Sequence, residues 1–400
     1  MATGSSPRSD VLHNMIRSRL TGLLAAVLIT GLVPVPAGAA TPHVRLLAEW
    51  TVPFGLTFAD TTVGGLSSID RDPRTGEYLL ISDDRSELQP ARFYTADIAV
   101  DAEGVHDVRF TGTHPFLRPD GETYPPLKQW TAAPCLQPRQ VCDRYGTVDP
   151  EELRLDPVTG EITWSQEGER ILPDVLLDPS IRRARWDGTY LGQLPLPAIE
   201  RMDTQQRGPR ANQTLEGMTY AAEGSLLVSA LEDPLIQDGP DPTPAAGALT
   251  RVTVQTRLGR VLAQYAYPLD PLFATPRPPN TSDTNGVSSI LAYDPVDPTR
   301  YLAVERAYAA GVGNKVRVYE TDTTGATNVR DLSSLAGAEI RPMRKRLLVD
   351  MDDVGLTRVD NIEGITWGPR LSTGERTLLL VSDNNFSSSQ ITELVALAVG

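Results

Sequence analysis

Acidic side chains recur at matching places in five related stretches of the chain. In each stretch, two short apolar runs flank a turn, and the second run ends on a polar, usually acidic, residue. The acids at the ends of second runs are Asp83, Asp84, Glu167, Glu232, Asp233, Glu305 and Asp383, and those at the starts of first runs are Glu151, Glu216 and Glu363. Carboxylates that come together repel one another unless a cation or an arginine compensates their charge. The alternative is that each acid closes its own hairpin by accepting hydrogen bonds from nearby backbone N–H groups.

Hard oxygen donors select Ca²⁺ or Mg²⁺ over zinc, and the scarcity of histidine, with four in the chain, agrees with that choice. Glutamate forms turns poorly, so a metal-binding role is favoured over hairpin closure for Glu216, Glu232 and Glu363. We therefore expect a Ca²⁺ site. Its predicted ligands are Asp83, Glu216, Glu232, Asp233, Glu305, Glu363 and Asp383.

Basic residues stand near these acids in the sequence. A metal that polarises phosphoryl oxygens, beside an arginine that binds them through two N–H groups, meets the needs of a phosphoester site. The predicted catalytic residues are Arg210, Glu216, Arg306 and Glu363, and Arg85 and Lys315 are predicted to bind the ligand. For each basic residue taken alone, an ordinary salt bridge is about as good an explanation as a phosphate-binding role.

Common catalytic motifs are missing from the chain. It has no Gly-x-Ser-x-Gly elbow, no P-loop and no dinucleotide glycine fingerprint. Beyond residue 39 the histidines are His43, His106 and His114, and none belongs to a familiar hydrolase pattern. A carboxylic-ester hydrolase of the Ser-His-Asp type is therefore disfavoured.

The elements that position these acids are repeated hairpins. The related stretches are residues 64–84, 151–167, 216–233, 285–306 and 363–384. Two apolar runs around a turn predict an antiparallel hairpin, and a third strand is expected at 92–94, 261–267, 315–319 and 393–397. A small sheet repeated at a long period is typical of propeller blades. We predict an all-β chain forming one β-propeller of about five to six blades over residues 40–400, with the possible sixth blade in residues 100–150 or before Gly64.

The N-terminal segment predicts export. Arginines precede an apolar stretch over 20–33, and small residues follow at 37–39, which is the order of a signal peptide over residues 1–39. An N-terminal membrane anchor is the alternative. No other segment is apolar over a spanning length, so we expect no membrane span in the mature chain and a secreted or periplasmic location. A net charge of −14 disfavours nucleic acid as a partner.

The chain has two cysteines, Cys135 and Cys142. Their close spacing in an exported protein favours one small disulfide within a loop.

Four strings of the sequence resemble a known family. They are Arg207–Met218, Glu232–Pro240, Val304–Tyr308 and, in two parts, Asp360–Ile365 with Leu379–Phe386. The likeness runs in order from about Val52 to the C-terminus and identifies the chain as similar to the phytase-like family labelled "esterase-like activity of phytase". Within these strings the candidate ligand-binding residues are Asn212, Gln237, Asn361 and Asn384.

That resemblance implies a propeller-like fold and a phosphoesterase activity, by analogy with calcium-dependent propeller phytases. The sequence departs from the family pattern where Glu232 and Asp233 stand in place of a single Glu, which leaves open which of the two is the ligand. We expect a secreted, calcium-dependent hydrolase of a small phosphorylated substrate, in which a metal-activated water attacks the phosphoester. The alternative is a non-catalytic propeller that binds a ligand or partner and carries structural calcium.

Overall fold

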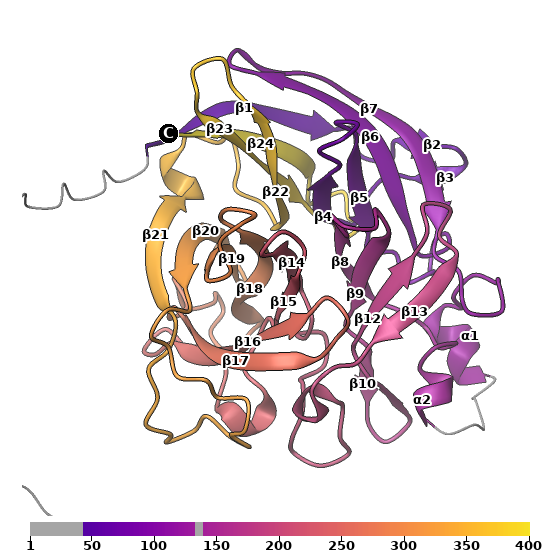
Figure 1. Cartoon of the computed structure of the whole chain (residues 1–400), viewed down its shortest axis with the longest axis vertical. Coiled ribbons are helices and arrows are strands. Elements are labelled where there is room, and N and C mark those ends of the chain that lie inside the picture. The colour runs from indigo at the N-terminus through magenta and orange to yellow at the C-terminus, as the bar shows by residue number, and fades with distance from the viewer. Residues whose placement is uncertain (1–42, 133–138) are drawn as a thin grey trace, which may run out of the picture. The chain divides into compact units, whose positions relative to one another are not determined.

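Five four-stranded antiparallel sheets surround one axis in the computed structural model, which describes residues 43–132 and 139–400 (Figure 1). Within these ranges nearly every element is a strand, so the predicted all-β propeller is confirmed. The predicted signal peptide and Cys135 lie outside the described residues. Cys142 is buried, and its disulfide with Cys135 stays a prediction.

Each sheet is one blade, and the strand next to the axis is the first of its blade in the chain for blades 1 to 4 and β22 (Ile362–Arg370) for blade 5. Blade 1 contains β4 (Leu66–Arg71), β5 (Tyr78–Ser82), β6 (Arg92–Asp101) and β7 (Gly104–Pro115). Blade 2 contains β8 (Pro150–Leu155), β9 (Ile162–Gln166), β12 (Ser180–Ala184) and β13 (Tyr190–Leu194). Blade 3 contains β14 (Gly217–Ala221), β15 (Leu226–Ala230), β16 (Ala248–Thr256) and β17 (Val261–Leu269).

Blade 4 contains β18 (Asp283–Ala292), β19 (Arg300–Ala309), β20 (Gly313–Asp322) and β21 (Arg344–Asp350). Blade 5 contains β22 (Ile362–Arg370), β23 (Arg376–Ser382), β24 (Thr392–Val399) and β1 (Val44–Val52). The connections hold the two-stranded ribbons β2 (Thr57–Phe58) with β3 (Thr61–Thr62) and β10 (Glu169–Ile171) with β11 (Val175–Leu177), the helices α1 (Leu127–Ala132) and α2 (Arg139–Cys142), and the 3₁₀ turns η1 (Ala198–Glu200), η2 (Ile236–Asp238) and η3 (Met351–Asp353).

The N-terminal strand closes the ring of blades. β1 pairs antiparallel with β24, from Val44 opposite Val399 to Val52 opposite Thr392. The region before Gly64 therefore completes blade 5, and residues 104–115 form the outer strand of blade 1, so no sixth blade exists in the described residues. The expected third strand at 261–267 is instead the fourth strand of its blade, because β16 precedes it.

The apolar core lies between neighbouring blades. Second strands such as β5 and β9 are buried along their whole length because other blades cover both of their faces. Between blades 1 and 2, for example, the rings of Phe116 and Trp164 stack with centroids 4.1 Å apart. Each of the five blade interfaces holds such a cluster, so burial of these faces stabilises the ring.

Glycines at repeat-equivalent positions allow the inner strands to approach closely. A Cβ atom on Gly217 would lie 2.9 Å from the backbone nitrogen of Ile290, and one on Gly364 would lie 2.8 Å from the Cα of Ser68. Because these contacts involve the backbone of the next inner strand, a larger side chain would force the blades apart. The repeated glycines of the sequence therefore mark the axis.

Arg154 of β8 fills the centre of the axis. Its guanidinium donates to the carbonyl oxygens of Ile69, Met218, Ile290 and Ile365 at 2.6, 2.8, 3.3 and 3.0 Å. These four carbonyls belong to the inner strands of the other four blades. One side chain thus joins all five blades and separates the two ends of the axis.

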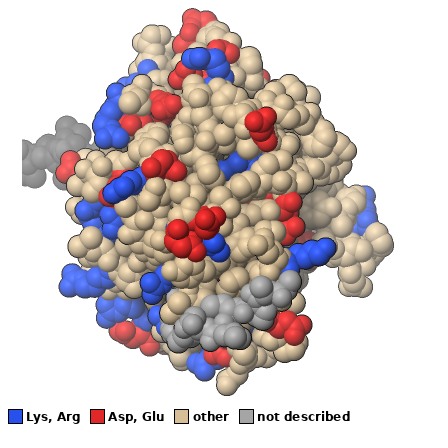
Figure 2. All heavy atoms as spheres, turned by 90° about the vertical axis from the view of Figure 1, so that its right-hand side faces the viewer, with Lys and Arg blue, Asp and Glu red and all other residues tan. Residues whose placement is uncertain are grey.

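Charges are mixed on the outside of the propeller. Figure 2 shows one side of the molecule, where acidic and basic side chains are interspersed and no broad basic patch is visible. Among the described residues, no helix is long and apolar enough to cross a membrane.

Candidate active site

Carboxylates meet at the end of the axis where the inner strands begin. Glu151 and Glu363 are the second residues of β8 and β22, and Glu216 directly precedes β14. Asp83 and Asp383 follow the second strands β5 and β23. This end forms a cavity of about 700 Å³. We call it the acidic cavity, and its polar lining includes Asp83, Arg85, Asp149, Glu151, Asn212, Glu216, Arg306, Asp360, Asn361, Glu363 and Asp383.

Two overlapping groups of three carboxylates lie in or beside this cavity. One group is Asp83, Asp149 and Glu151, and the other is Glu151, Glu167 and Glu216. Within each group, one oxygen of every residue lies within 4.8 Å of the others. Glu151 belongs to both groups, so it lies between two potential cation positions.

Three of these carboxylates are not among the ligands that the sequence predicts. Glu151 and Glu167 stand at the ends of the apolar runs, whereas Asp149 lies outside them. Asp149 stands two residues before Glu151, and residues at that spacing in an extended segment share a face. That alternation was the signal that could have identified Asp149.

Burial makes the charges of this cavity costly. It raises the pKa of Glu216, and neighbouring Glu232 and Glu167 raise it further. Burial likewise raises the pKa of Asp83, with a further contribution from Asp149. Burial raises the pKa of Glu363 to about 8, although Arg306 opposes this shift. Ionised carboxylates here require compensation by a cation.

Three buried carboxylate oxygens in these groups have no hydrogen-bond partner in the described chain. They are Oδ1 of Asp83, Oδ2 of Asp149 and Oε2 of Glu167. Buried polar atoms are normally bonded, and an unsatisfied one points to an ion or water. Oxygen-only clusters of this kind suit Ca²⁺ or Mg²⁺, so the residues present fit a hard divalent cation.

Three arginines line the acidic cavity, and one of them, Arg358, is paired with Asp360 at 3.0 Å. Nη2 of Arg306 lies 3.1 Å from Oε1 of Glu232 and 3.3 Å from Oε1 of Glu363. Nε of Arg85 lies 3.4 Å from Oδ1 of Asp149, and its Nη2 contacts Glu169. Nε of Arg306 is buried and has no partner among the described residues, so it remains available to an anionic ligand.

The remaining predicted residues near the cavity have defined neighbours. Asn212 lines the cavity, as does Asn361, whose Nδ2 donates to Oε1 of Glu363 at 3.0 Å. Glu232 reaches the site as the ion-pair partner of Arg306. Asp233 is buried beside it, with Oδ1 unpartnered in the described chain.

Glu305 lies apart from the other predicted ligands, which corrects the expectation that it converges with them. Its carboxylate accepts from the hydroxyl of Tyr267 at 2.8 Å and contacts Nζ of Lys345. Adjacent residues of a strand point to opposite faces, so β19 directs Arg306 to the cavity and Glu305 toward blade 3.

Two predicted basic residues also lie outside the acidic cavity. Arg210 donates to the carbonyl oxygens of Pro234 and Gly239 at 3.1 and 2.7 Å and so holds a loop. Nζ of Lys315 lies 2.7 Å from Asp350 and 2.6 Å from Asp352. Arg210 and Lys315 thus interact with nearby groups of their own loops and strands, and neither lies near the carboxylate groups.

Two predicted amide residues likewise shape loops. Oε1 of Gln237 accepts from the backbone nitrogen of Gly208 at 2.8 Å. Oδ1 of Asn384 accepts from the backbone nitrogens of Gly65 and Phe386, each at 3.0 Å. Both side chains therefore hold loop backbone in place, and neither residue lines the acidic cavity.

The fold and site together define a five-bladed β-propeller with a carboxylate-lined cavity at one end of its axis. The chain belongs to the phytase-like family, described as "esterase-like activity of phytase", whose sequence pattern matches residues 61–386. A sequence search of curated proteins gives no match.

Similarity to solved structures is low. An α-L-arabinofuranosidase from Lactobacillus brevis is 9% identical, with a TM-score of 0.44, over 83% of this chain and 90% of that one. An N-acetylgalactosamine deacetylase from F. plautii is 8% identical, with a TM-score of 0.41, over 90% and 94% of the two chains. A gluconolactonase from Xanthomonas campestris is 11% identical, with a TM-score of 0.32, over 91% and 98%.

Proposed function

We propose that the protein is an exported, calcium-dependent hydrolase that cleaves a small phosphoester in the acidic cavity. The observation that best supports this proposal is the pair of overlapping carboxylate groups. Three of their buried oxygens have no hydrogen-bond partner in the described chain. Membership of the phytase-like family supports a phosphorylated substrate. Export rests on the signal peptide predicted from residues 1–39.

The residues that would hold calcium are Asp83, Asp149, Glu151, Glu167 and Glu216. Bound Ca²⁺ would supply a Lewis acid for phosphoryl oxygens and would lower the pKa of a coordinated water. The ion would also offset the repulsion among these buried carboxylates.

Arg306 is the residue best placed to bind a phosphate oxygen. Its ion pairs with Glu232 and Glu363 fix the guanidinium in one orientation, and its Nε is left to donate. Charge-assisted hydrogen bonds from arginine to phosphate are short and strong. Arg85, fixed by Asp149 and Glu169, would contribute a second positive charge across the cavity.

The test is a panel of phosphomonoesters, phosphodiesters and carboxylic esters, assayed with excess calcium and with a chelator. We expect calcium-dependent release of phosphate and no carboxylic-ester cleavage. Arg306→Lys should raise KM for the phosphoester and leave calcium binding intact, because lysine lacks the planar guanidinium. Arg317→Lys, at an ion pair on blade 4 with Asp350, is the matched control.

One result would replace the catalytic proposal with the binding-module alternative. If calcium stabilises the protein but no phosphoester is bound or cleaved, the cavity carries structural calcium. If calcium has no effect on stability or activity, both interpretations fail.

A further inference from the structure

A second cavity lies at the opposite end of the axis, where the inner strands finish. The inner strands contribute Asp70 from β4, Arg154–Leu155 from β8, Thr219–Tyr220 from β14, Leu291–Ala292 from β18 and Thr366–Trp367 from β22. The cavity has a volume of about 370 Å³. That volume is near the lower end of the roughly 300–1,000 Å³ typical of small-molecule pockets. Arg154 separates it from the acidic cavity, so the two ends are independent sites.

The walls of the second cavity are mainly apolar and include a fixed aromatic ring. Leu291 and the prolines of three hairpin turns, Pro73, Pro157 and Pro295, line it together with Trp367. Nε1 of Trp367 donates to the carbonyl oxygen of Ala292 at 2.9 Å, which fixes the indole. The guanidinium carbon of Arg376 lies 3.4 Å from the centre of the indole, which fixes it further. A preset aromatic surface binds a flat apolar face at little cost in conformational entropy.

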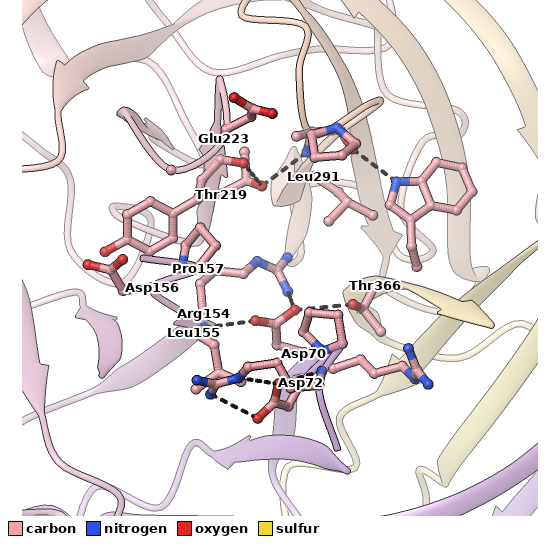
Figure 3. A pocket seen from close by; sticks show the side chains of 18 of the residues that line it. Asp70, Asp72, Arg154, Leu155, Asp156, Pro157, Thr219, Glu223, Leu291 and Thr366 are labelled. Carbon is pink, nitrogen blue, oxygen red and sulfur yellow. Dashed lines mark hydrogen bonds and ion pairs between the residues drawn. The ribbon is translucent and has the colours of Figure 1, made fainter. Parts of the chain in front are cut away.

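Asp70 lines this cavity, and Figure 3 shows its carboxylate bonded to neighbouring residues. Its Oδ1 accepts from the hydroxyl of Thr366 at 3.2 Å, and its Oδ2 accepts from the backbone nitrogen of Leu155 at 2.8 Å. The side chain is 15% exposed. A carboxylate has about four acceptor positions, so Asp70 retains capacity for donors of a ligand. Its contacts with two blades hold it in one orientation.

The charges around the second cavity balance. Its lining includes the carboxylates of Asp70, Asp72, Asp156 and Glu223 and the guanidiniums of Arg71, Arg74, Arg154 and Arg376. Among them, Arg74 and Asp72 form a local ion pair at 3.0 Å. Equal numbers of opposite charges select neither a net anion nor a net cation. They do suit a neutral ligand that both donates and accepts hydrogen bonds.

We propose that the second cavity binds a neutral carbohydrate. A sugar ring combines an apolar C–H face, which suits Trp367, with hydroxyl groups that donate to Asp70. Arg71 also lines the cavity, and a guanidinium can donate to a hydroxyl oxygen. This proposal does not depend on hydrolysis at the acidic cavity.

The test measures binding of neutral sugars to the full chain. Glucose, galactose, mannose, maltose and cellobiose are titrated by calorimetry, with benzoate and benzylamine as charged probes. We expect saturable binding of at least one sugar with a dissociation constant of about 1 mM or tighter. Binding should persist in the presence of a calcium chelator. Preference for either charged probe over every sugar, or no binding at all, would overturn the proposal.

A second readout locates the binding site. With ¹⁵N-labelled tryptophan, the indole signal of Trp367 is identified by its loss in Trp367→Phe, among the five tryptophans of the chain. Sugar should shift this signal in the otherwise unaltered protein, which tests the site even where a variant folds poorly. Asp70→Asn should weaken binding at least tenfold, whereas Glu122→Gln, at an exposed position, should not. Sugar binding that leaves the Trp367 signal unchanged contradicts the proposal.

Discussion

Nη2 of Arg154 lies 3.1 Å from Oε2 of Glu152, two residues earlier on the same inner strand. Both side chains are buried at the axis, with exposed fractions of 3% and 1%. Glu152 also accepts from the hydroxyl of Ser289 at 2.6 Å and from that of Ser68. The pair therefore connects strands that are distant in the sequence and completes the centre of the propeller.

Replacing Arg154 by leucine should destabilise the fold strongly. The substitution leaves Glu152 buried without its charge partner and removes donors from the carbonyls of four other strands. Breaking a buried ion pair typically costs about 3–5 kcal/mol. Urea unfolding at pH 8 should show this loss.

The matched control is Arg330→Leu. Arg330 pairs with Asp331 at the surface, where the side chains are 43% and 86% exposed. Such pairs contribute at most about 1 kcal/mol. Equal effects of the two substitutions would show that the axial pair has no special role.

Removing β1 should open the ring. A chain that begins at residue 53 lacks the strand that pairs with β24, whose residues are buried along their whole length. The exposed edge would invite association with other chains. We expect a lower melting temperature and oligomers in size-exclusion chromatography. A chain that begins at residue 43 keeps β1 and should behave like the intact protein, and similar behaviour of both truncations would contradict closure by β1.

Calcium should raise the melting temperature if the carboxylate groups bind it. A ligand specific for the folded state adds about 2.7 kcal/mol at a concentration of 100 times its dissociation constant. Glu216→Gln removes one charge with little change in shape, so it should reduce the calcium-dependent shift. Glu305→Gln should leave that shift unchanged, because Glu305 lies outside the groups. A shift equally reduced in both variants would argue against the assigned ligands.

Glu200 should contribute a decrease in stability as the pH rises. Burial raises the pKa of Glu200 from the usual 4.5 to about 7. Hydrogen bonds donated to its Oε1 by Thr253 at 2.6 Å and by Gln264 at 2.7 Å lower the pKa and so oppose this shift. Between pH 4.5 and 7 the unfolded chain loses this proton first, so the free energy of unfolding decreases over that interval and then levels.

Glu200→Gln should remove the contribution of Glu200 and leave that of other buried acids with a raised pKa, such as Glu152. Between pH 5 and pH 8, the free energy of unfolding of the variant should increase relative to that of the unaltered protein by on the order of 3 kcal/mol. This value is an upper bound set by the pKa shift. Denaturant unfolding at both values measures the change, with the exposed substitution Glu122→Gln as control. If the free energies of unfolding of the variant and of the unaltered protein differ by the same amount at pH 5 and pH 8, the raised pKa of Glu200 is contradicted.

The architecture could be predicted because short sequence patterns specify each hairpin and recur in every blade. Apolar runs around a turn define each hairpin, and glycines such as Gly217 and Gly364 recur where inner strands approach closely. Acids at strand ends, including Glu216 and Glu363, reach one cavity because equivalent positions of every blade lie at the same end of the axis. These features depend on residues close in sequence.

Tertiary structure decided which of the acids meet and which are already paired. Glu305 and Arg306 are adjacent in sequence, yet strand alternation sends one to Lys345 and the other to Glu232 and Glu363. The position of Arg154 and the pairing of Val44 with Val399 depend on contacts between residues far apart in the chain. A local pattern specifies how a strand alternates, but not which neighbour covers each face, and that neighbour determines whether a charge is paired, buried or free to bind.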